Sequence, residues 1–232
     1  MTVEIGDDGL LLDGEPLRLL TGSVQYWRLD PAAWPRILDR VADLGLLGIE
    51  VYMPWSAHET APGAFDFSGP RDLSRFLDLA AERGLKVIAR PGPHINAEIT
   101  GFGYPDRILE DPELQARGPE GNPVFCPAPP RMFPVPSNAG DGLYREFERY
   151  LEALVPILEP RQHPDGPIVA LQADNENTMF FRIAAFDLDY SNDSIADYRE
   201  FLAGKYSTIA KLNKAYGDTH AGFDSVQPPK RF

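Results

Sequence analysis

The sequence predicts an α/β fold of parallel strands, and three observations carry the prediction. Short apolar runs typical of buried strands alternate along the chain with amphipathic segments of helical period. Polar and aromatic residues follow several of these runs, where each strand ends. Glycine and proline mark many of the borders. Alternating strands and helices form parallel β/α units with right-handed crossovers, which leaves two architectures, an open doubly wound sheet and a (β/α)8 barrel.

The end of the first barrel-type strand separates these two architectures. A doubly wound sheet predicts a glycine-rich phosphate-binding loop there, and Gly22–Trp27 has no such pattern. A (β/α)8 barrel instead places its chemistry at the ends of several strands, as the sequence does. The barrel is therefore favoured, although the chain holds only about four to five of its β/α units. Residues 1–232 are expected to form the N-terminal part of one TIM barrel domain, truncated after those units.

Each expected element has a local signal. Asp13-Gly14 predicts a hairpin whose second arm runs on as the first barrel strand into Gly22–Tyr26. Asp30 and Gly45 mark the start and end of the first long helix. The segment Gly92–Gly142 is rich in proline and glycine, and so long a loop is expected to be functional. The other helices and strands are expected at Pro31–Leu44, Gly48–Met53, Asp72–Arg83, Leu85–Pro91, Leu143–Leu158, Pro167–Gln172, Ser194–Lys205 and Thr208–Tyr216.

Composition and charge exclude several classes of protein. Hydrophobic residues make up 43% and charged residues 25% of the chain, which is ordinary for a soluble globular protein. The net charge of -13 argues against a nucleic-acid partner, because phosphate binding needs a basic face, whereas a neutral sugar is compatible with it. No apolar stretch approaches the roughly 20 residues that cross a bilayer. No basic and then apolar leader opens the chain, so we expect a cytoplasmic protein with no membrane partner.

The sequence gives no sign of a metal or a cofactor. Cys126 is the only cysteine, so neither an intrachain disulfide nor a cysteine-based metal cluster can form. It lies in a proline-rich segment without a nearby base, and we interpret it as a bystander thiol. His58 and His94 follow different strands and lack tight metal-ligand spacing. We therefore expect no metal site and no cofactor.

Three strand ends deliver polar groups toward one place. Glu176 follows the apolar run Pro167–Gln172, and a carboxylate at the tip of a buried strand is costly unless it is paired, hydrogen-bonded or needed for chemistry. Arg90–Glu98 follows a second apolar run, and Tyr52–Glu59 follows a third. This clustering indicates an active site more than a scatter of surface residues.

Glycoside hydrolysis fits the residue types at these strand ends. The reaction usually needs two carboxyl groups, one acting as acid and then base and one as nucleophile or base. Glu176 suits the acid role if apolar surroundings or a second carboxylate keep it protonated, and the amide of Asn175 suits a hydrogen bond to a ring hydroxyl. Trp34 lies on the apolar stripe of its helix and is expected in the core. The aromatic residues that fit either a sugar platform or the core are Tyr26, Trp27 and Trp55.

Four ordered segments form a more specific pattern. They are Gly22–Arg28, Val51–Glu59 with Gly63–Gly69, Arg90–Glu98 and Gln172–Glu176. In this order they resemble the N-terminal half of the catalytic barrel of glycoside hydrolase family 35 β-galactosidases. Phe201–Gly217 is similar to the family 42 β-galactosidases of the same clan. The resemblance covers the chain from about Leu10 to its end.

The resemblance implies a retaining glycosidase. Glu176 would be the general acid/base, and Asn175 would hold the sugar hydroxyl next to the reacting carbon. The residues that would line the galactose subsite are Tyr52, Asn96, Ala97 and Glu98. The family's nucleophile is a glutamate after a later strand, and no residue in this chain matches it. The chain departs from the family at Gln25, His94, Ile99 and Asn177-Thr178, where His, Tyr, Trp and Tyr-Gly are usual. These departures surround the subsite and bear on the preferred sugar.

Three hypotheses remain open on the sequence. The leading one is a glycosidase that acts on terminal β-galactosides or related β-glycosides. The second is a non-catalytic carbohydrate-binding pseudoenzyme or an inactive fragment, because the nucleophile is absent. The third pairs Glu98 with Glu176 across adjacent strands, which lie about 4.8 Å apart. Half a barrel would also leave unpaired strand edges, so we expect self-association or a partner.

Overall fold

The computed structural model describes residues 2–7, 9–128, 131–176 and 186–230. The chain divides into two compact units. Unit 1 comprises Met1–Pro105 and Phe147–Asn177, and unit 2 comprises Asp106–Glu146 and Thr178–Phe232. The helix α5 (Asp141–Leu158) contributes residues to both units. Each unit is described by itself below.

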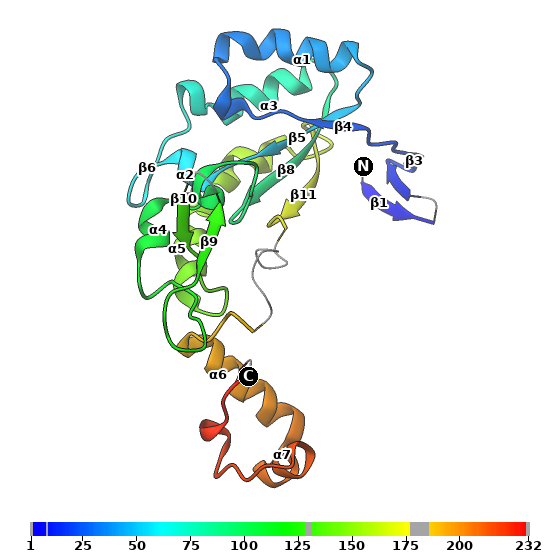
Figure 1. Ribbon diagram of the computed structural model, residues 1–232. Coiled ribbons are helices and arrows are strands. Elements are labelled where there is room, and N and C mark those ends of the chain that lie inside the picture. Colours follow the sequence, from blue (N-terminus) through cyan, green and yellow to red (C-terminus); the bar gives the residue numbers. More distant parts are fainter. Residues whose placement is uncertain (1, 8, 129–130, 177–185, 231–232) are drawn as a thin grey trace. The chain divides into compact units, whose positions relative to one another are not determined.

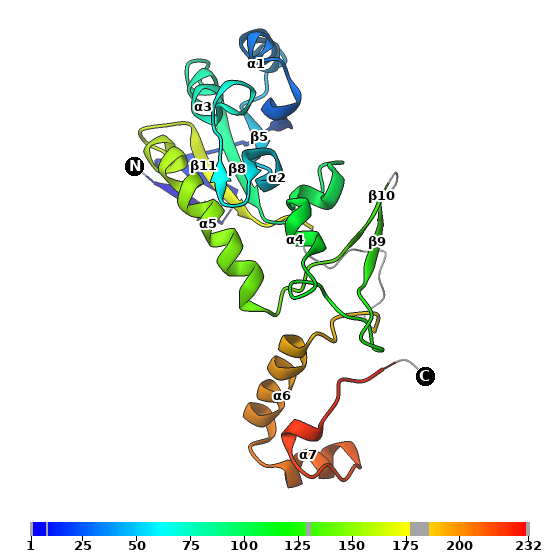
Figure 2. The ribbon, with the colours of Figure 1, turned by 90° about the vertical axis from the view of Figure 1, so that its left-hand side faces the viewer.

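Unit 1 is built on a parallel sheet with the strand order β11-β8-β5-β4 (Figure 1). Its helices include α1, α3 and the C-terminal part of α5 (Figures 1 and 2). Strands and helices alternate along the chain, as the sequence predicts. The bounds of these elements are β4 (Thr21–Ser23), α1 (Trp34–Asp43), β5 (Gly48–Tyr52), α3 (Leu73–Ala81), β8 (Lys86–Gly92) and β11 (Ile168–Ala173).

The helix starts in unit 1 follow the capping signals of the sequence. The side chain of Asp30 accepts a hydrogen bond from the Ala32 backbone N–H at 2.9 Å, and a short 3-10 turn leads into α1. Asp72 does the same for Arg75 at the start of α3, also at 2.9 Å. Gly84, at φ 68°, ends the turn that follows α3. These caps satisfy backbone N–H groups that have no partner inside the helix. Both helix predictions are confirmed.

The two faces of the parallel sheet differ in composition. Ile49 pairs with Val87 and Val51 with Ala89, and all four residues are buried. Because successive strand residues point to opposite faces, Glu50, Tyr52 and Arg90 share the other face. The side chain of Arg90 is 12% exposed and that of Glu50 is 30% exposed. One face therefore belongs to the apolar core, and the other carries charge.

A small antiparallel sheet precedes the parallel sheet along the chain. It consists of β1 (Val3–Gly6), β2 (Gly9–Leu12) and β3 (Glu15–Pro16), and the hairpin at Asp13-Gly14 is confirmed. The prediction that its second arm runs on as the first barrel strand is wrong. Strand β3 ends at Pro16, and the Leu20 N–H donates to the Arg18 carbonyl at 2.9 Å in a turn before β4 begins.

Unit 2 corrects the prediction of a long irregular loop. The segment between Gly92 and Gly142 contains α4 (Asp106–Glu110) and a hairpin of β9 (Phe125–Ala128) and β10 (Arg131–Pro134). The prolines within the hairpin strands obscured it, because proline lowers the strand signal. The helices α6 (Asn192–Tyr206) and α7 (Ile209–Tyr216) are confirmed. They enclose a small core of Leu202, Leu212 and Val226.

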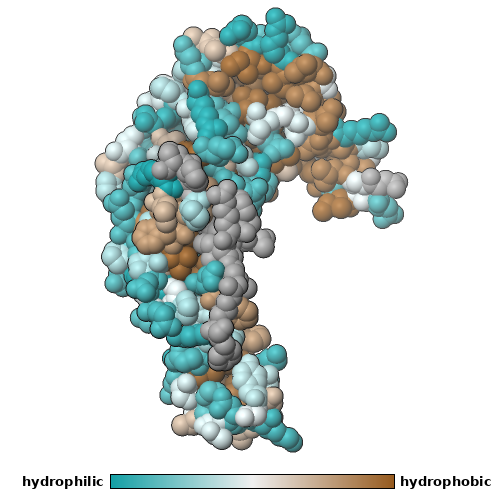
Figure 3. All heavy atoms as spheres, viewed as in Figure 1, coloured by the Kyte–Doolittle hydropathy of each residue, from teal (hydrophilic) through white to brown (hydrophobic). Residues whose placement is uncertain are grey.

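The remaining short elements connect these parts. They are η1 (Tyr26–Arg28), η2 (Pro31–Ala33), α2 (Trp55–His58), β6 (Glu59–Ala61), β7 (Ala64–Phe65), η3 (Gly69–Arg71), η4 (Thr100–Gly103), η5 (Glu159–Arg161) and η6 (Phe223–Ser225). Exposed apolar side chains lie around the end of α1 and the start of β5, among them Leu20, Leu44 and Leu47, and Figure 3 shows hydrophobic surface in this region. In the part of the chain that the structure describes, no helix is both long and apolar enough to cross a membrane.

Candidate active site

A cavity of about 340 Å³ opens at the carboxyl ends of the parallel strands in unit 1. Parallel β/α folds bind their ligands at this end of the sheet. The cavity is lined by Ser23, Gln25, Arg28, Tyr52, Asn96, Ala97, Glu98, Asn175 and Glu176. The structure thus brings all six predicted site residues together around one space. The lining also includes Gln25, which the family resemblance had placed around the subsite, and Ser23 and Arg28, which had no predicted role there.

The loop after β8 presents three lining residues on a left-handed backbone. Asn96, Ala97 and Glu98 have φ values of 46°, 46° and 48°. Residues other than glycine avoid this region, and such strain persists only where the surroundings impose it. Arg28 donates hydrogen bonds to the carbonyls of Ala97 and Glu98, at 2.6 and 3.0 Å. Its guanidinium therefore holds the loop in the strained conformation.

The carboxylate of Glu176 is tied to this loop. Its Oε2 accepts a hydrogen bond from the side-chain amide of Asn96 at 2.5 Å. Glu176 itself has φ 49°, just after β11, and it is exposed at the cavity. The Asn96 bond occupies Oε2, and Oε1 remains for other partners as far as the described residues are concerned. The carboxylate is thereby fixed at the wall of the cavity and does not point away from it.

Asn175 is buried, and the protein holds both ends of its carboxamide. Its Oδ1 accepts from the Tyr52 hydroxyl at 3.2 Å, from Gln172 Nε2 at 3.3 Å and from Arg90. Its Nδ2 donates to the Ile95 carbonyl at 3.2 Å. An amide nitrogen carries two hydrogens. One N–H of Asn175 therefore remains for a ligand, as far as the described residues are concerned.

Two charged residues that the sequence analysis did not assign lie directly behind Asn175. Arg90 Nη1 donates to Glu50 Oε2 at 2.5 Å, and the Thr21 hydroxyl donates to Glu50 Oε1 at 2.9 Å. The guanidinium also lies 4.1 Å from the centroid of the Tyr52 ring. A signal was present in the sequence, because each charge interrupts an otherwise apolar strand. In the sequence prediction Arg90 opens the polar segment Arg90–Glu98, whereas Glu50 has no role.

Burial shifts the pKa of two groups beside the cavity. Burial raises the pKa of the Tyr52 phenol, partly offset by the neighbouring Arg90 charge. Tyr52 is therefore a neutral hydroxyl that donates to Asn175. Burial also raises the pKa of Asp174, whose Oδ1 accepts the backbone N–H groups of His94 and Asn175, each at 2.9 Å. These bonds fix the backbone immediately before Glu176.

The predicted aromatic platforms lie mostly in the core. Tyr26 and Trp55 have no exposed surface, so neither offers a face to a sugar. The prediction that Trp34 belongs to the core is confirmed. Trp27 is half-buried and donates its ring N–H to the Tyr52 carbonyl at 3.2 Å. The sequence could not decide between core and sugar platform for Tyr26, Trp27 and Trp55, because all three rings follow or enter apolar segments.

The histidines considered as metal ligands have structural contacts instead. The ring of His58 contacts the Tyr26 hydroxyl through Nε2 at 2.5 Å and the Asp66 carbonyl through Nδ1 at 2.9 Å. His94 contacts the Asn175 carbonyl through Nδ1 at 2.5 Å. Among the described residues, no group of three or more His, Cys, Asp or Glu side chains is arranged to hold a metal ion. Cys126, the predicted bystander, is buried.

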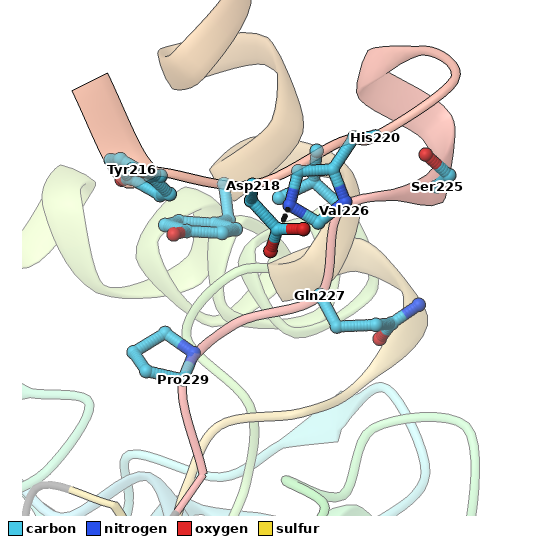
Figure 4. Close-up of a pocket in the computed structure, with 8 residues that line it drawn as sticks. Tyr216, Asp218, His220, Ser225, Val226, Gln227 and Pro229 are labelled. Carbon is cyan, nitrogen blue, oxygen red and sulfur yellow. Dashed lines mark ion pairs between the residues drawn. The ribbon is translucent and has the colours of Figure 1, made fainter. Parts of the chain in front are cut away.

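A second cavity, of about 410 Å³, lies on unit 2 and contains none of the predicted site residues (Figure 4). In it, His220 Nε2 pairs with Asp218 Oδ2 at 3.1 Å. Burial, together with the neighbouring Tyr216, raises the pKa of Tyr198 to about 12. The cavity is lined by Tyr198, Tyr216, Asp218, His220, Ser225, Val226, Gln227 and Pro229. Nothing in the sequence analysis had pointed to it.

Comparison with known families gives the chain its assignment. The model of the family described as glycosyl hydrolases family 35 matches residues 9–127, just over half of the chain. The chain belongs to this family. The match includes Tyr52, Asn96, Ala97 and Glu98, and it ends before Asn175 and Glu176.

Curated relatives carry several names. A "Beta-galactosidase" of Mus musculus is 34% identical over 84% of this family 35 chain, and a "Beta-1,2-glucosyltransferase" of Ignavibacterium album is 31% identical over 94% of it. An "Exo-beta-D-glucosaminidase" of Pyrococcus horikoshii is 31% identical over 99% of it. The chain spans only 27%, 30% and 30% of these three proteins.

Solved structures support the fold of the family 35 chain. A β-galactosidase from the psychrophilic Marinomonas ef1 matches 90% of the chain with a TM-score of 0.67 and 22% identity, and the match covers 30% of that protein. At this level of identity the similarity establishes the α/β fold with a parallel sheet. It does not extend to site residues.

Proposed function

We propose that this chain is the N-terminal part of the catalytic (β/α)8 barrel of a retaining family 35 glycosidase, with about four to five β/α units in residues 1–232. Its substrates would be terminal β-galactosides or related β-glycosides. The observation that carries the proposal is the cavity in which Glu176 and Asn175 meet the loop 96–98 and Tyr52 at the strand ends. The names of the relatives agree on a β-linkage but differ in the sugar and, for the glucosyltransferase, in the reaction.

In this proposal Glu176 is the general acid/base. Its Oε2 accepts the N–H of Asn96, so Oε1 would carry the proton that is given to the glycosidic oxygen as the bond to the sugar breaks. In the second step the Glu176 carboxylate would take a proton from the water that attacks the anomeric carbon. Tyr52, Asn175 and Glu98 would hold sugar hydroxyls. The nucleophile that attacks in the first step would be a carboxylate from a later strand, outside this chain.

The test uses the protein expressed from its complete reading frame. Glu176→Gln is expected to lower the hydrolysis of an alkyl β-galactoside by about 10²- to 10⁴-fold, because proton donation to the leaving group is lost. A dinitrophenyl β-galactoside, whose leaving group needs no proton, should be affected much less. Azide should restore turnover in Glu176→Ala. Glu82→Gln, an exposed glutamate at the end of α3, is the matched control.

Full activity of Glu176→Gln on the alkyl galactoside would reject the assignment of Glu176. Reading the coding DNA beyond the codon for Phe232 separates the remaining candidates. A later strand that ends in a glutamate favours the hydrolase. A stop codon at that point, together with sugar binding and no turnover, favours the carbohydrate-binding pseudoenzyme. Turnover by the 232-residue chain alone, abolished by Glu98→Gln, would favour the pairing of Glu98 with Glu176.

A further inference from the structure

A row of polar side chains crosses the open face of the parallel sheet behind the cavity. Thr21 on β4 donates to Glu50 on β5, and Glu50 accepts from Arg90 on β8. Arg90 in turn donates through Nη2 to Oδ1 of Asn175, just after β11. The row thus crosses three strands and ends on Asn175, a residue of the cavity wall that follows the fourth. The ion pair between Glu50 and Arg90 is therefore connected to the cavity through Asn175.

We propose that Arg90, held by Glu50, is a positioning residue that fixes the carboxamide of Asn175 so that an N–H faces the sugar. The ligand group at this point would then be an oxygen acting as acceptor, and the family resemblance implies the hydroxyl on the carbon next to the anomeric carbon. The inference rests on the proposed function, because it names how the same cavity recognises a glycoside. It adds two residues, Arg90 and Glu50, that do not line the cavity.

The contacts of Asn175 determine which end of its amide faces the ligand. Three donors, from Tyr52, Gln172 and Arg90, converge on Oδ1. If the amide were flipped, its NH2 group would face a guanidinium and a donating phenol, which is a repulsive arrangement of donors. The charged donor is the strongest of the three. Arg90 therefore contributes most to holding the amide in the observed orientation.

The carboxylate of Glu50 offsets the cost of burying the charge of Arg90. A charged side chain that is only 12% exposed is costly without an opposite charge, and Glu50 supplies that charge. The face of the Tyr52 ring, 4.1 Å away, adds a favourable cation–π contact. The rigid fork of arginine reaches Glu50 with one nitrogen and Asn175 with the other. Lysine has a single ammonium and cannot reproduce this two-sided contact.

The experiment compares sugars with and without the hydroxyl in question. Dissociation constants are measured by calorimetry for methyl β-galactoside and its 2-deoxy analogue, and for the corresponding pair of glucosides. We expect Arg90→Lys to weaken binding of the preferred parent glycoside by about tenfold, since that is the affinity that one misplaced hydrogen bond can cost. The same variant should leave binding of the 2-deoxy analogue within about threefold of wild type. Where turnover is measurable, Arg90→Lys should lower kcat and raise KM for the parent sugar.

A double-mutant cycle tests whether Arg90 acts through Asn175. Arg90→Lys combined with Asn175→Ala should bind the parent sugar no more weakly than Asn175→Ala alone. Arg83→Lys is the matched control. The side chain of Arg83 is also largely buried, and it forms an ion pair with Asp39 at 2.7 Å, but neither residue lines the cavity. This variant should leave binding of both sugars unaffected. If Arg90→Lys folds poorly, Glu50→Leu/Arg90→Met removes both charges together and should still lose the distinction between parent and 2-deoxy sugar.

The outcomes separate this inference from the proposed function. Equal losses for parent and 2-deoxy sugar, or additive losses in the cycle, overturn the positioning role and leave the glycosidase proposal standing. Wild-type protein that binds none of the four sugars overturns both. A preserved distinction in the charge-free double variant also rejects the role of Arg90.

Discussion

The two faces of the parallel sheet in unit 1 differ in the side chains they carry: one is apolar and the other is charged. On the face that belongs to the apolar core, here called the helical side, the paired residues Ile49–Val87 and Val51–Ala89 have buried apolar side chains. On the other side, Glu50 and Arg90, in the same strands, form an ion pair that leads to the cavity. The difference arises from the two-residue alternation of a strand, which lets each strand serve folding with one residue and recognition with the next. We expect stability and sugar binding to separate along the same line.

The largest expected effect is a loss of stability on the helical side. Phe76 on α3 has no exposed surface, and its ring centroid lies 5.4 Å from that of Tyr26 and 5.5 Å from that of Trp34. Phe76→Ala should lower the free energy of unfolding by about 3–5 kcal/mol, because it leaves a cavity in the core. Urea unfolding measures the change, with the exposed Phe201→Ala as control. A cost below about 1 kcal/mol would show that this side is not the main source of stability.

An intermediate effect is expected from pH, through a histidine in the same core. Burial lowers the pKa of His58 to about 4, whereas the unfolded side chain titrates near 6.5. Between these values the unfolded chain binds a proton that the folded chain does not. Stability should therefore fall as pH drops from about 6.5 toward 4, by up to about 3 kcal/mol from this group.

Two measurements check the contribution of His58. Titration of its ring by NMR should show a neutral imidazole down to about pH 4. Urea unfolding at pH 7.5 and 4.5 should show a smaller loss in His58→Gln than in wild type. An imidazole that titrates near 6.5 in the folded protein would contradict the prediction, and it would place His58 in contact with water.

The smallest effect is expected on the polar side. Thr21→Val keeps the shape of the side chain and removes the 2.9 Å hydrogen bond to Glu50. It should lower the free energy of unfolding by about 1 kcal/mol, since hydrogen bonds to charged groups contribute modestly when partly exposed. Thr60→Val, which removes an exposed 3.3 Å bond to the Ala64 carbonyl, is the control and should change little. A cost as large as that of Phe76→Ala would erase the contrast between the faces.

The sequence predicted the parts of the fold that rest on local signals. Asp30 marked the start of the first helical segment, because its side chain caps the turn η2 that leads into α1, and the helix predicted from Asp72 begins one residue later, at Leu73. The hairpin β9–β10 was missed because its local signal is weak. Pro127 and Pro134 lie inside its strands, and its pairing depends on contacts between residues that the local pattern does not report.

The site shows the same limit. Glu176 and Asn175 were found because each follows a strand end, which is a local feature. Arg90 was predicted at a strand end, but its pairing with Glu50 was not, because that pairing depends on register. Tyr52 lies directly opposite Arg90, and Glu50 lies diagonally across from Arg90. Tyr26 and Trp55 were left open between ligand and core, since an aromatic ring beside an apolar run has the same appearance in both cases.

The left-handed loop 96–98 limits how this subsite can be redesigned. At φ 46°, position 97 admits glycine or asparagine far more readily than valine or isoleucine. Many substitutions of Ala97, the β-branched ones above all, would thus strain the loop, whatever the new side chain offers a ligand. Altered selectivity is better sought at Gln25 or Ser23, which line the same cavity from a backbone that is not left-handed.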